Sequence, residues 1–131
     1  MNRIKELLSQ YNRFEECIIR EIKWLDYGLT YEVIFDYIWD EEGKIRKNLD
    51  VDLRVSIRFN LVQEFHFNSN LDKHMVLHSE NINWGINDIS LIQVAENSAS
   101  LEKYADLPIP FYHIEIRWED ARRIDIICAG I

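Results

Sequence analysis

The segment from Leu49 to Leu61 alternates strictly between apolar and polar side chains. Every odd-numbered position in it is Leu, Val, Ile or Phe, and every even-numbered position is Asp, Arg, Ser or Asn. On a helix the apolar side chains would scatter around the axis, whereas a strand places all of them on one face. The segment therefore predicts a β-strand whose apolar face must be buried against another layer of the fold.

This predicted strand is unusually long. At about 3.3 Å per residue it would span roughly 40 Å, much more than a common strand. Two apolar residues, Leu61 and Val62, meet at its end, and Phe65 and Phe67 then resume the alternation. We therefore expect a bend or bulge near Leu61 and Val62.

Similar alternation recurs along most of the chain, between clusters of turn-forming residues. Near the start, however, Ile4, Leu7, Leu8 and Tyr11 fall at helical spacing behind Asn2, a good N-cap, and predict a short N-terminal helix. Residues 97–106 are expected to be a loop or a weak short helix. The predicted strands cover residues 18–24, 31–39, 49–67, 89–95, 111–118 and 123–129, with room for a short strand at Met75–Leu77 inside an Asn-rich segment.

The chain has 131 residues and shows no linker or internal repeat, so we expect a single domain over residues 1–131. A hydrophobic content of 47% with only 4 glycines and 2 prolines argues against disorder and low-complexity structure. The predicted fold is mainly β with one short N-terminal helix. Both an antiparallel β-sandwich and a flattened barrel fit the pattern, with the helix covering an edge or an open end.

Acidic residues dominate the charge, with 23 Asp and Glu against 15 Lys and Arg and a net charge of -8. This charge opposes binding to nucleic-acid phosphates and to anionic membrane surfaces, so we expect neither as a partner. Residues 61–110 hold seven acids and only two lysines. That middle stretch is where a basic protein partner is expected to bind.

The expected location is the cytoplasm. No stretch approaches the roughly 18 consecutive apolar residues of a membrane span, and the start of the chain lacks the apolar core of a secretory signal. Cys17 and Cys128 lie near opposite ends and predict neither a disulfide framework nor a zinc ribbon. Cys128 follows Ile124 and Ile126 at a spacing of two and is expected to be buried.

His74 and His78 are the sharpest metal-binding candidates. An i, i+4 pair on a helix can place two imidazoles on one ion, with Asp72 or Glu80 as a third ligand. The surrounding sequence is not convincingly helical, and on a strand the two side chains would lie about 13 Å apart. We therefore favour solvated loop or strand histidines, and no metal or other cofactor is predicted.

Asp36, Asp40, Glu41 and Glu42 place four carboxylates within seven residues. The spacing of an EF-hand calcium loop is absent, so a solvated hairpin tip is the favoured interpretation. The functional alternative is that Asp40, Glu41 and Glu42 form an electrostatic landing site for a basic partner protein.

The tryptophans Trp24, Trp39, Trp84 and Trp118 are many for a chain of this length. Large aromatic residues build the cores of small β domains, and we expect most of these to be buried. Trp84, in its Asn-rich loop, is expected to be partly exposed and joins the three carboxylates as a candidate partner-binding residue. Alternatively, Trp39 and Trp84 with a carboxylate or His74 would line a small-molecule pocket.

Local signatures of catalysis are missing from the sequence. The chain has no G-x-S-x-G elbow, no P-loop and no G-x-G-x-x-G motif. Neither cysteine has a visible base or helix N-terminus to activate it. His66 and His113 are expected to be ordinary surface residues of strands. The chain is therefore predicted not to be an enzyme.

A resemblance to known domains rests on the order of four features. They are Trp24-Leu25-Asp26, Phe59 to Phe65, Ile82 to Asp88, and the hairpin from Trp118 to Ile127. In this order the chain resembles small bacterial domains of uncharacterised function, over most of its length after residue 14. In size, acidity and β-rich layout it resembles, more loosely, the β-rich immunity proteins of bacterial polymorphic toxin systems. The second resemblance implies a cytoplasmic protein that binds and occludes one cognate toxin, and it carries over no functional residue.

Two functions from different classes follow. The first is a non-enzymatic protein-binding domain, most concretely an immunity-type inhibitor whose acidic surface meets a basic partner. The second is a small-molecule-binding or enzymatic β domain with an aromatic-lined pocket. A homodimer formed through an open sheet edge is a third arrangement.

Overall fold

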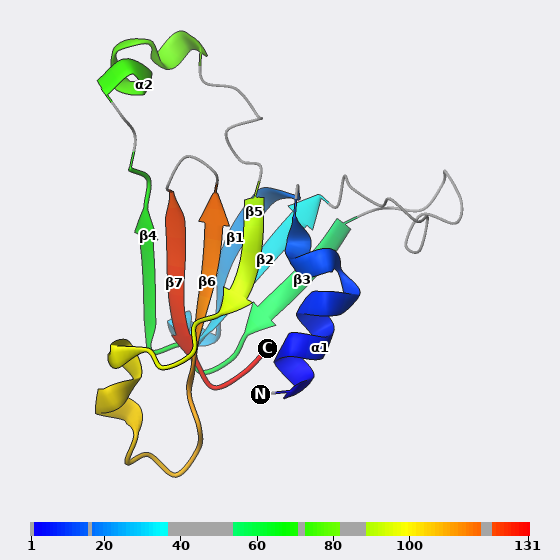
Figure 1. Cartoon of the computed structure of the whole chain (residues 1–131), viewed down its shortest axis with the longest axis vertical. Helices are drawn as coiled ribbons and strands as arrows, with labels where there is room; N and C mark the ends of the chain where they lie inside the picture. The colour runs from blue at the N-terminus through cyan, green and yellow to red at the C-terminus, as the bar shows by residue number, and fades with distance from the viewer. Residues whose placement is uncertain (1, 16, 37–53, 71–72, 82–88, 119–121) are drawn as a thin grey trace.

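The computed structural model describes residues 2–15, 17–36, 54–70, 73–81, 89–118 and 122–131. Within them the protein is mainly β, with two antiparallel sheets and one short N-terminal helix (Figure 1). The N-terminal helix α1 spans Asn2–Gln10. The strands are β1 (Ile18–Leu25), β2 (Thr30–Asp36), β3 (Arg54–Phe59), β4 (Glu64–Asn68), β5 (Ile89–Val94), β6 (Tyr112–Trp118) and β7 (Arg123–Cys128).

The strand order is β1-β2-β3 in the smaller sheet and β4-β7-β6-β5 in the larger one. Every pairing between the described strands is antiparallel, and no described strand of one sheet pairs with a strand of the other. The protein is therefore a sandwich of two sheets, which confirms the first of the two predicted architectures. The sheets do not close into a barrel, so the flattened-barrel alternative is wrong.

The expected bend at Leu61 is where the chain changes sheets. β3 ends at Phe59 in the smaller sheet, and β4 starts at Glu64 in the larger one. Leu61 adopts a φ of 47°, and Asn60 N–H donates to the Gly130 carbonyl at 2.8 Å on the far side of the crossing. One alternating pattern therefore supplies inner-face residues to both layers, and the predicted single strand is divided. The part of it before Arg54 lies outside the described residues.

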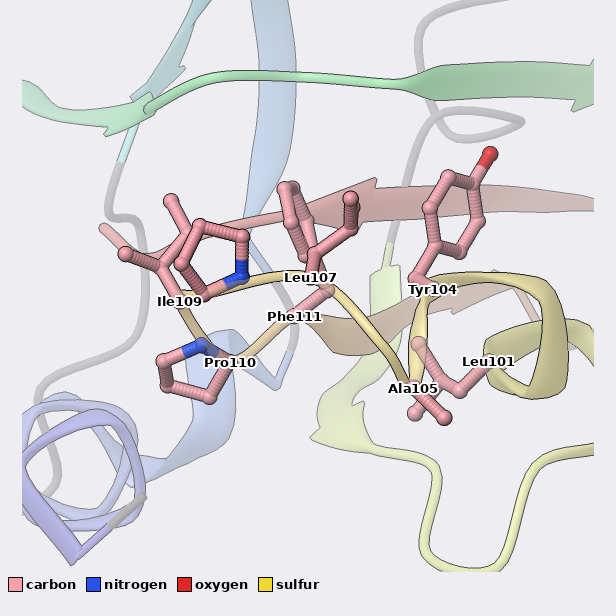
Figure 2. A pocket seen from close by; sticks show the side chains of 8 residues that line it. Leu101, Tyr104, Ala105, Leu107, Ile109, Pro110 and Phe111 are labelled. Carbon is pink, nitrogen blue, oxygen red and sulfur yellow. The ribbon is translucent and has the colours of Figure 1, made fainter.

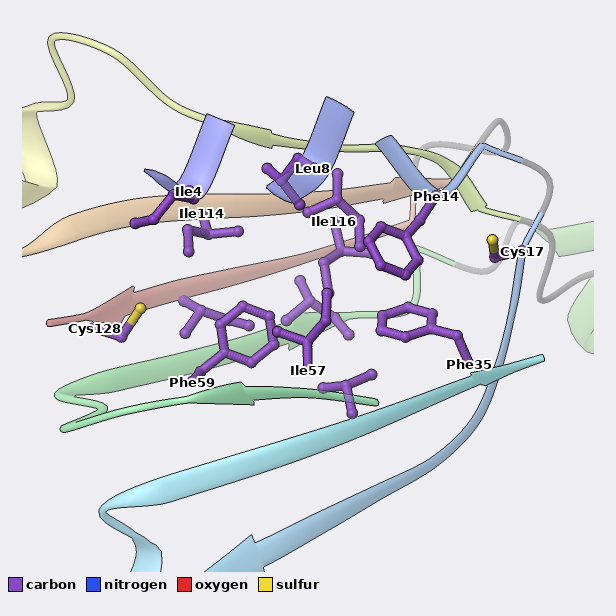
Figure 3. Close-up of a cluster of buried hydrophobic side chains, with 14 of the residues drawn as sticks. Ile4, Leu8, Phe14, Cys17, Phe35, Ile57, Phe59, Ile114, Ile116 and Cys128 are labelled. Atoms are coloured by element: carbon purple, nitrogen blue, oxygen red, sulfur yellow. The ribbon is translucent and has the colours of Figure 1, made fainter. Parts of the chain in front are cut away.

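The core lies between the inner faces of the two sheets (Figure 3). Val33, Phe35, Ile57 and Phe59 from the smaller sheet meet a layer of isoleucines from β5, β6 and β7. The buried isoleucines are Ile92, Ile114, Ile116, Ile124 and Ile126. β-branched residues suit a pleated, buried surface, and each fully buried side chain of this size contributes roughly 1.5–3 kcal/mol.

Helix α1 covers one side of the sandwich, alongside β5 (Figure 1). Its apolar stripe buries Ile4 and Leu8, as the helical spacing predicts. The short 3-10 helix η1 (Asn12–Phe14) follows and inserts Phe14, whose ring lies 4.8 Å from that of Phe35. The prediction that the helix covers an edge or open end of the β fold is confirmed.

Both cysteines are buried, and neither forms a disulfide. Burial in apolar surroundings raises the pKa of the Cys128 thiol to about 12, so it is a small core residue, as expected from its spacing.

The predicted short strand at Met75–Leu77 is wrong. These residues belong to a small helix, α2 (Lys73–Leu77), followed by the 3-10 turn η3 (Ser79–Asn81). The local bond from His78 N–H to the His74 carbonyl, 3.0 Å long, satisfies the backbone without any sheet partner. None of the helices in the described ranges is long and apolar enough to cross a membrane.

Candidate functional sites at the open side and on the larger sheet

The predicted partner-binding residues Asp40, Glu41, Glu42 and Trp84 lie outside the described residues, as does Trp39. The residues outside the described ranges include 10 of the 23 acidic residues of the chain but only 3 of its 15 basic ones. Charges in the described part of the chain are consequently almost balanced. The acidic landing site therefore stays a prediction.

The outer face of the smaller sheet carries exposed ion pairs. Glu32 accepts from Arg58 at 2.7 Å, and Asp36 accepts from Arg20 at 3.2 Å. Exposed pairs of this kind contribute about 0–1 kcal/mol each because water and salt screen them. This face has balanced charges and offers no concentration of one sign.

Opposite α1, the sandwich is open between the edge strands β1 and β4. Trp24 and Phe67 lie on the inward-facing sides of these strands but are 74% and 52% exposed. The ring centroids of Trp24 and Tyr31 lie 6.1 Å apart, and those of Tyr31 and Phe65, which stack, lie 4.5 Å apart. A row of aromatic side chains therefore joins the two sheets. Of the predicted core tryptophans, Trp118 is buried but Trp24, on the edge strand β1, is not.

The turn between β1 and β2 continues this exposed apolar surface. It is the 3-10 turn η2 (Asp26–Gly28), in which Asp26, Tyr27 and Gly28 have φ values of 50°, 59° and 88°. A positive φ is natural for Gly28 but costs a bulky residue such as Tyr27 about 1–2 kcal/mol. Tyr27 is fully exposed. We call the exposed residues Trp24, Tyr27, Leu29 and Leu61 the aromatic patch.

The outer face of the larger sheet carries a second, polar constellation. His66, Asp125, Glu115 and Gln93 face one another in a row across β4, β7, β6 and β5. Arg123 donates to both carboxylates, at 2.6 Å to Asp125 and 3.2 Å to Glu115. His66 at the end of the row is exposed, but Glu115, Asp125 and Arg123 are half-buried or buried, so the hydrogen bonds among these three are less screened than those on the smaller sheet.

Both carboxylates in this row stay ionised at neutral pH. Burial alone would raise the pKa of Asp125, but hydrogen bonds from Arg123 and His113 outweigh it and lower the pKa. The pKa of Glu115 is lowered in the same way, because bonds from Gln93 and Arg117 outweigh the effect of its burial.

His113 departs from the prediction of a surface residue. It is only 8% exposed, and its ring is held from both sides. Its Nε2 lies 2.6 Å from Asp125 Oδ1, and its Nδ1 lies 2.7 Å from Ser98 Oγ. The prediction failed because alternation puts His113 on the outer face, where Ser98 of the preceding loop and Asp125 of β7 contact the ring.

A pocket of about 410 Å³ lies in the loop between β5 and β6 (Figure 2). This loop contains the 3-10 helix η5 (Ala99–Tyr104), which agrees with the weak helix expected there. The pocket is lined by apolar and aromatic side chains from η5 and the following Pro-containing segment, namely Leu101, Tyr104, Ala105, Leu107, Pro108, Ile109, Pro110 and Phe111. A volume of this size lies within the range that small ligands occupy.

The loop is tied to the larger sheet by Tyr104. Its hydroxyl donates to Glu64 Oε2 at 2.6 Å, and Lys103 Nζ lies 3.0 Å from the same oxygen. The Tyr104 bond is the largest of several, including one from His66, that lower the pKa of Glu64 to about 2.

Two histidine-containing groups bear on metal binding. Ligand atoms of His113, Glu115 and Asp125 lie within 4.8 Å of one another, but the Arg123 guanidinium already neutralises both carboxylates. His74 lies in α2 and His78 directly follows its last residue, with ring centroids 4.7 Å apart, so the geometric objection to their pairing was wrong. Of the two candidate third ligands, Glu80 Oε1 lies 3.5 Å from His78 Nδ1, and Asp72 lies outside the described residues. Within the described residues, His74, His78 and Glu80 do not bring three ligand atoms close enough together to hold an ion.

No protein-family model matches this chain, and no curated protein is significantly similar to it. The residues that meet at the two candidate sites come from distant parts of the sequence. Ser98, His113 and Asp125 stand in separate segments, and no local motif marks any of them. The exposure of Trp24 and Tyr27 likewise has no signal in an alternating strand followed by Asp-Tyr-Gly.

Proposed function

We propose that this chain is a protein-binding domain that uses the aromatic patch to bind its partner. The observation that carries the proposal is the conformation of Tyr27, a large aromatic residue at a φ of 59° whose side chain is fully exposed. The fold gains nothing from that ring. Strained residues that the fold does not need are typical of functional surfaces.

Trp24 supports the proposal from the neighbouring strand. Trp and Tyr are enriched among the residues that dominate binding energy, because they bury much area with few rotatable bonds. The ring of Trp24 is held against Tyr31, and Leu29 and Leu61 flank the turn with exposed apolar side chains. Such a surface is organised before any partner arrives, which lowers the entropy lost on binding.

In its most specific form, the proposal is an immunity-type inhibitor that binds one basic toxin in the cytoplasm. The acidic excess supports this form, because opposite charge speeds association with a basic protein. The aromatic patch would then contribute most of the binding free energy, and the acidic residues among 61–110 would raise the rate of association with the toxin. Two buried cysteines that form no disulfide fit a reducing compartment.

Growth rescue tests the proposal. A candidate toxin gene chosen from the genomic neighbourhood is expressed with the unaltered chain, with Trp24→Ala or with Tyr27→Gly. The unaltered chain should restore growth, and each variant should bind the toxin at least about 10-fold more weakly, as expected for a central aromatic residue. Leu77→Ala on α2 is the matched control, because Leu77 is also exposed and lies outside the patch.

Failure of the unaltered chain to restore growth, with no toxin recovered alongside it, would contradict the inhibitor. Equal binding of the toxin by all three variants would contradict the proposal that the aromatic patch is the binding site. The remaining alternative occupant is a second copy of this chain at a sheet edge. Light scattering distinguishes it, because a dimer that Trp24→Ala dissociates would place a second copy on the patch.

A further inference from the structure

The pocket lies in the loop between β5 and β6, and the Ser98–His113 pair joins the start of this loop to β6. Ser98 Oγ and His113 Nδ1 lie 2.7 Å apart, and Ala95 N–H donates to the His113 carbonyl at 2.8 Å. Leu101, which lines the pocket, donates its N–H to the Ser98 carbonyl at 3.2 Å, and Phe111 precedes His113 by two residues. The loop that forms the pocket of Figure 2 is therefore fastened at its start to β6 by a hydroxyl–imidazole pair.

The directions of the hydrogen bonds follow from the chemistry of the groups. The Asp125 carboxylate can only accept, so His113 Nε2 carries the hydrogen in their 2.6 Å contact. In the neutral ring Nδ1 is then an acceptor, and the Ser98 hydroxyl donates to it. This is the polarity in which an imidazole removes a hydroxyl proton while a carboxylate orients the ring.

In the Ser98–His113–Asp125 arrangement, Asp125 is held in place by hydrogen bonds, and Ser98 is accessible to solvent. Arg123 donates two hydrogen bonds to Asp125, of 2.6 Å and 2.8 Å, which hold its carboxylate in place. His113 is buried, whereas Ser98 is only half-buried at the start of η5. Ser98 Oγ also accepts from Ser100 N–H at 3.3 Å, so its position is defined.

We propose that Ser98 is the nucleophile of an esterase site, with His113 as the general base, Asp125 as its positioning residue and the loop pocket as the binding site for a short apolar acyl group. This activity goes beyond partner binding. It uses the outer face of the larger sheet and none of the aromatic patch.

The reaction balances with water as the only co-reactant. His113 Nδ1 takes the Ser98 proton as Oγ forms a bond to the ester carbonyl carbon, and the carbon–oxygen bond to the alcohol breaks. The alcohol leaves with the proton from Nδ1. Water then loses a proton to Nδ1 and attacks the acyl carbon, and Ser98 recovers its proton as the carboxylic acid departs. The sum is ester plus water giving acid plus alcohol.

A fluorophosphonate probe on the full chain tests the nucleophile. Ser98 Oγ should displace fluoride from phosphorus, and the mass should increase by one probe group at Ser98. Ser98→Ala should remain unlabelled, and Ser100→Ala, two residues away and exposed, should label like the unaltered chain. Absence of any adduct on the unaltered chain, or an adduct that persists in Ser98→Ala, would overturn the proposal.

Hydrolysis of p-nitrophenyl butyrate gives a second readout. The unaltered chain should exceed the buffer rate, and Ser98→Ala should reduce kcat/KM by about 100-fold or more, because both nucleophile and proton transfer are lost. Ser100→Ala and Trp24→Ala should stay within about two-fold, which separates this site from the aromatic patch. A rate no faster than buffer would overturn the esterase. Far-UV circular dichroism of each variant confirms that it is folded.

Discussion

Phe14 and Tyr27 share a backbone conformation and differ in everything around it. Each is an aromatic residue with a φ of 59° within a short 3-10 turn, Phe14 as the last residue of η1 and Tyr27 as the middle residue of η2. Phe14 is completely buried under α1 and packs on Phe35, whereas Tyr27 is fully exposed at the open side of the sandwich. Burial of Phe14 offsets its strain, and nothing within the fold offsets that of Tyr27.

The difference teaches how to separate a residue that the fold needs from one that it only presents. When the packing of a side chain stabilises the fold by several kcal/mol, this free energy compensates for the strain of its backbone. A strained residue whose side chain contributes nothing to packing requires an explanation outside the fold, and binding to a partner is the simplest explanation. The same contrast holds for the two sides of the sandwich, since α1 closes one and leaves β1 and β4 exposed at the other.

Replacement of Phe14 by alanine should have the largest effect on stability. We expect a loss of about 3–5 kcal/mol, because the variant leaves a cavity beside Phe35 and loosens α1 from β5. Urea unfolding followed by fluorescence measures it. The contrast with Tyr27 would be broken if Phe14→Ala unfolded at the same urea concentration as the unaltered chain.

Acid should weaken the attachment of the loop to the edge strand β4. The folded pKa of Glu64 is about 2, below its ordinary value of 4.5, so the stabilisation is present above 4.5 and is lost as the pH falls towards 2. Tyr104→Phe removes the largest cause of this lowering, so the variant should lose about 1 kcal/mol at pH 7 and depend less on pH in that window.

Urea midpoints at pH 7 and pH 3 measure this dependence for both proteins. Glu64→Gln is the control, because it removes the titrating group while keeping a hydrogen-bonding side chain. If Tyr104→Phe kept the full pH dependence of the unaltered chain, the Tyr104 bond would not be what holds the carboxylate ionised.

Trp24→Ala should affect stability much less than Phe14→Ala does. The ring is mostly exposed and loses only its contact with Tyr31, so we expect a change of less than about 1 kcal/mol. The same urea titration measures it beside the partner-binding assay. A loss as large as that of Phe14→Ala would mean that Trp24 is part of the core and would remove it from the patch.

The smallest and most informative effect is at Tyr27. Glycine accepts a positive φ without strain, so Tyr27→Gly should leave stability unchanged or raise it by up to about 1 kcal/mol, while Phe14→Gly should lower it strongly. Thermal unfolding of the two variants under one buffer condition makes the comparison. A destabilised Tyr27→Gly would show that the fold does use this ring.

Much of the fold followed from local pattern. The alternation around Val55 and Ile57 predicted β3, and the helical spacing of Ile4 and Leu8 predicted α1. Leu61 was recognised as a bend because two apolar neighbours cannot both face one side of a strand. Local periodicity was less informative in the Asn-rich segment, where a strand was expected at Met75–Leu77 and a one-turn helix formed.

The candidate sites were less accessible to the same reasoning. Ser98 and Asp125 meet at His113 only because β6 pairs with β7 and the loop folds back over the sheet. Trp24 and Trp118 sit in similar alternating segments, yet one is exposed and the other buried. Which strand lies at an edge, and what covers it, is not encoded in the period of a single strand.

By itself, then, the sequence determined the class of the fold, because a period of two can bury its apolar residues only in a sheet. It also determined the net charge of -8 and the absence of local catalytic motifs. Only the tertiary structure decided that Phe14 is covered and Tyr27 is not, and that a serine, a histidine and an aspartate join in one hydrogen-bonded chain. The physical reason is that burial and hydrogen-bond partnership depend on neighbours brought from distant segments, which local spacing does not specify.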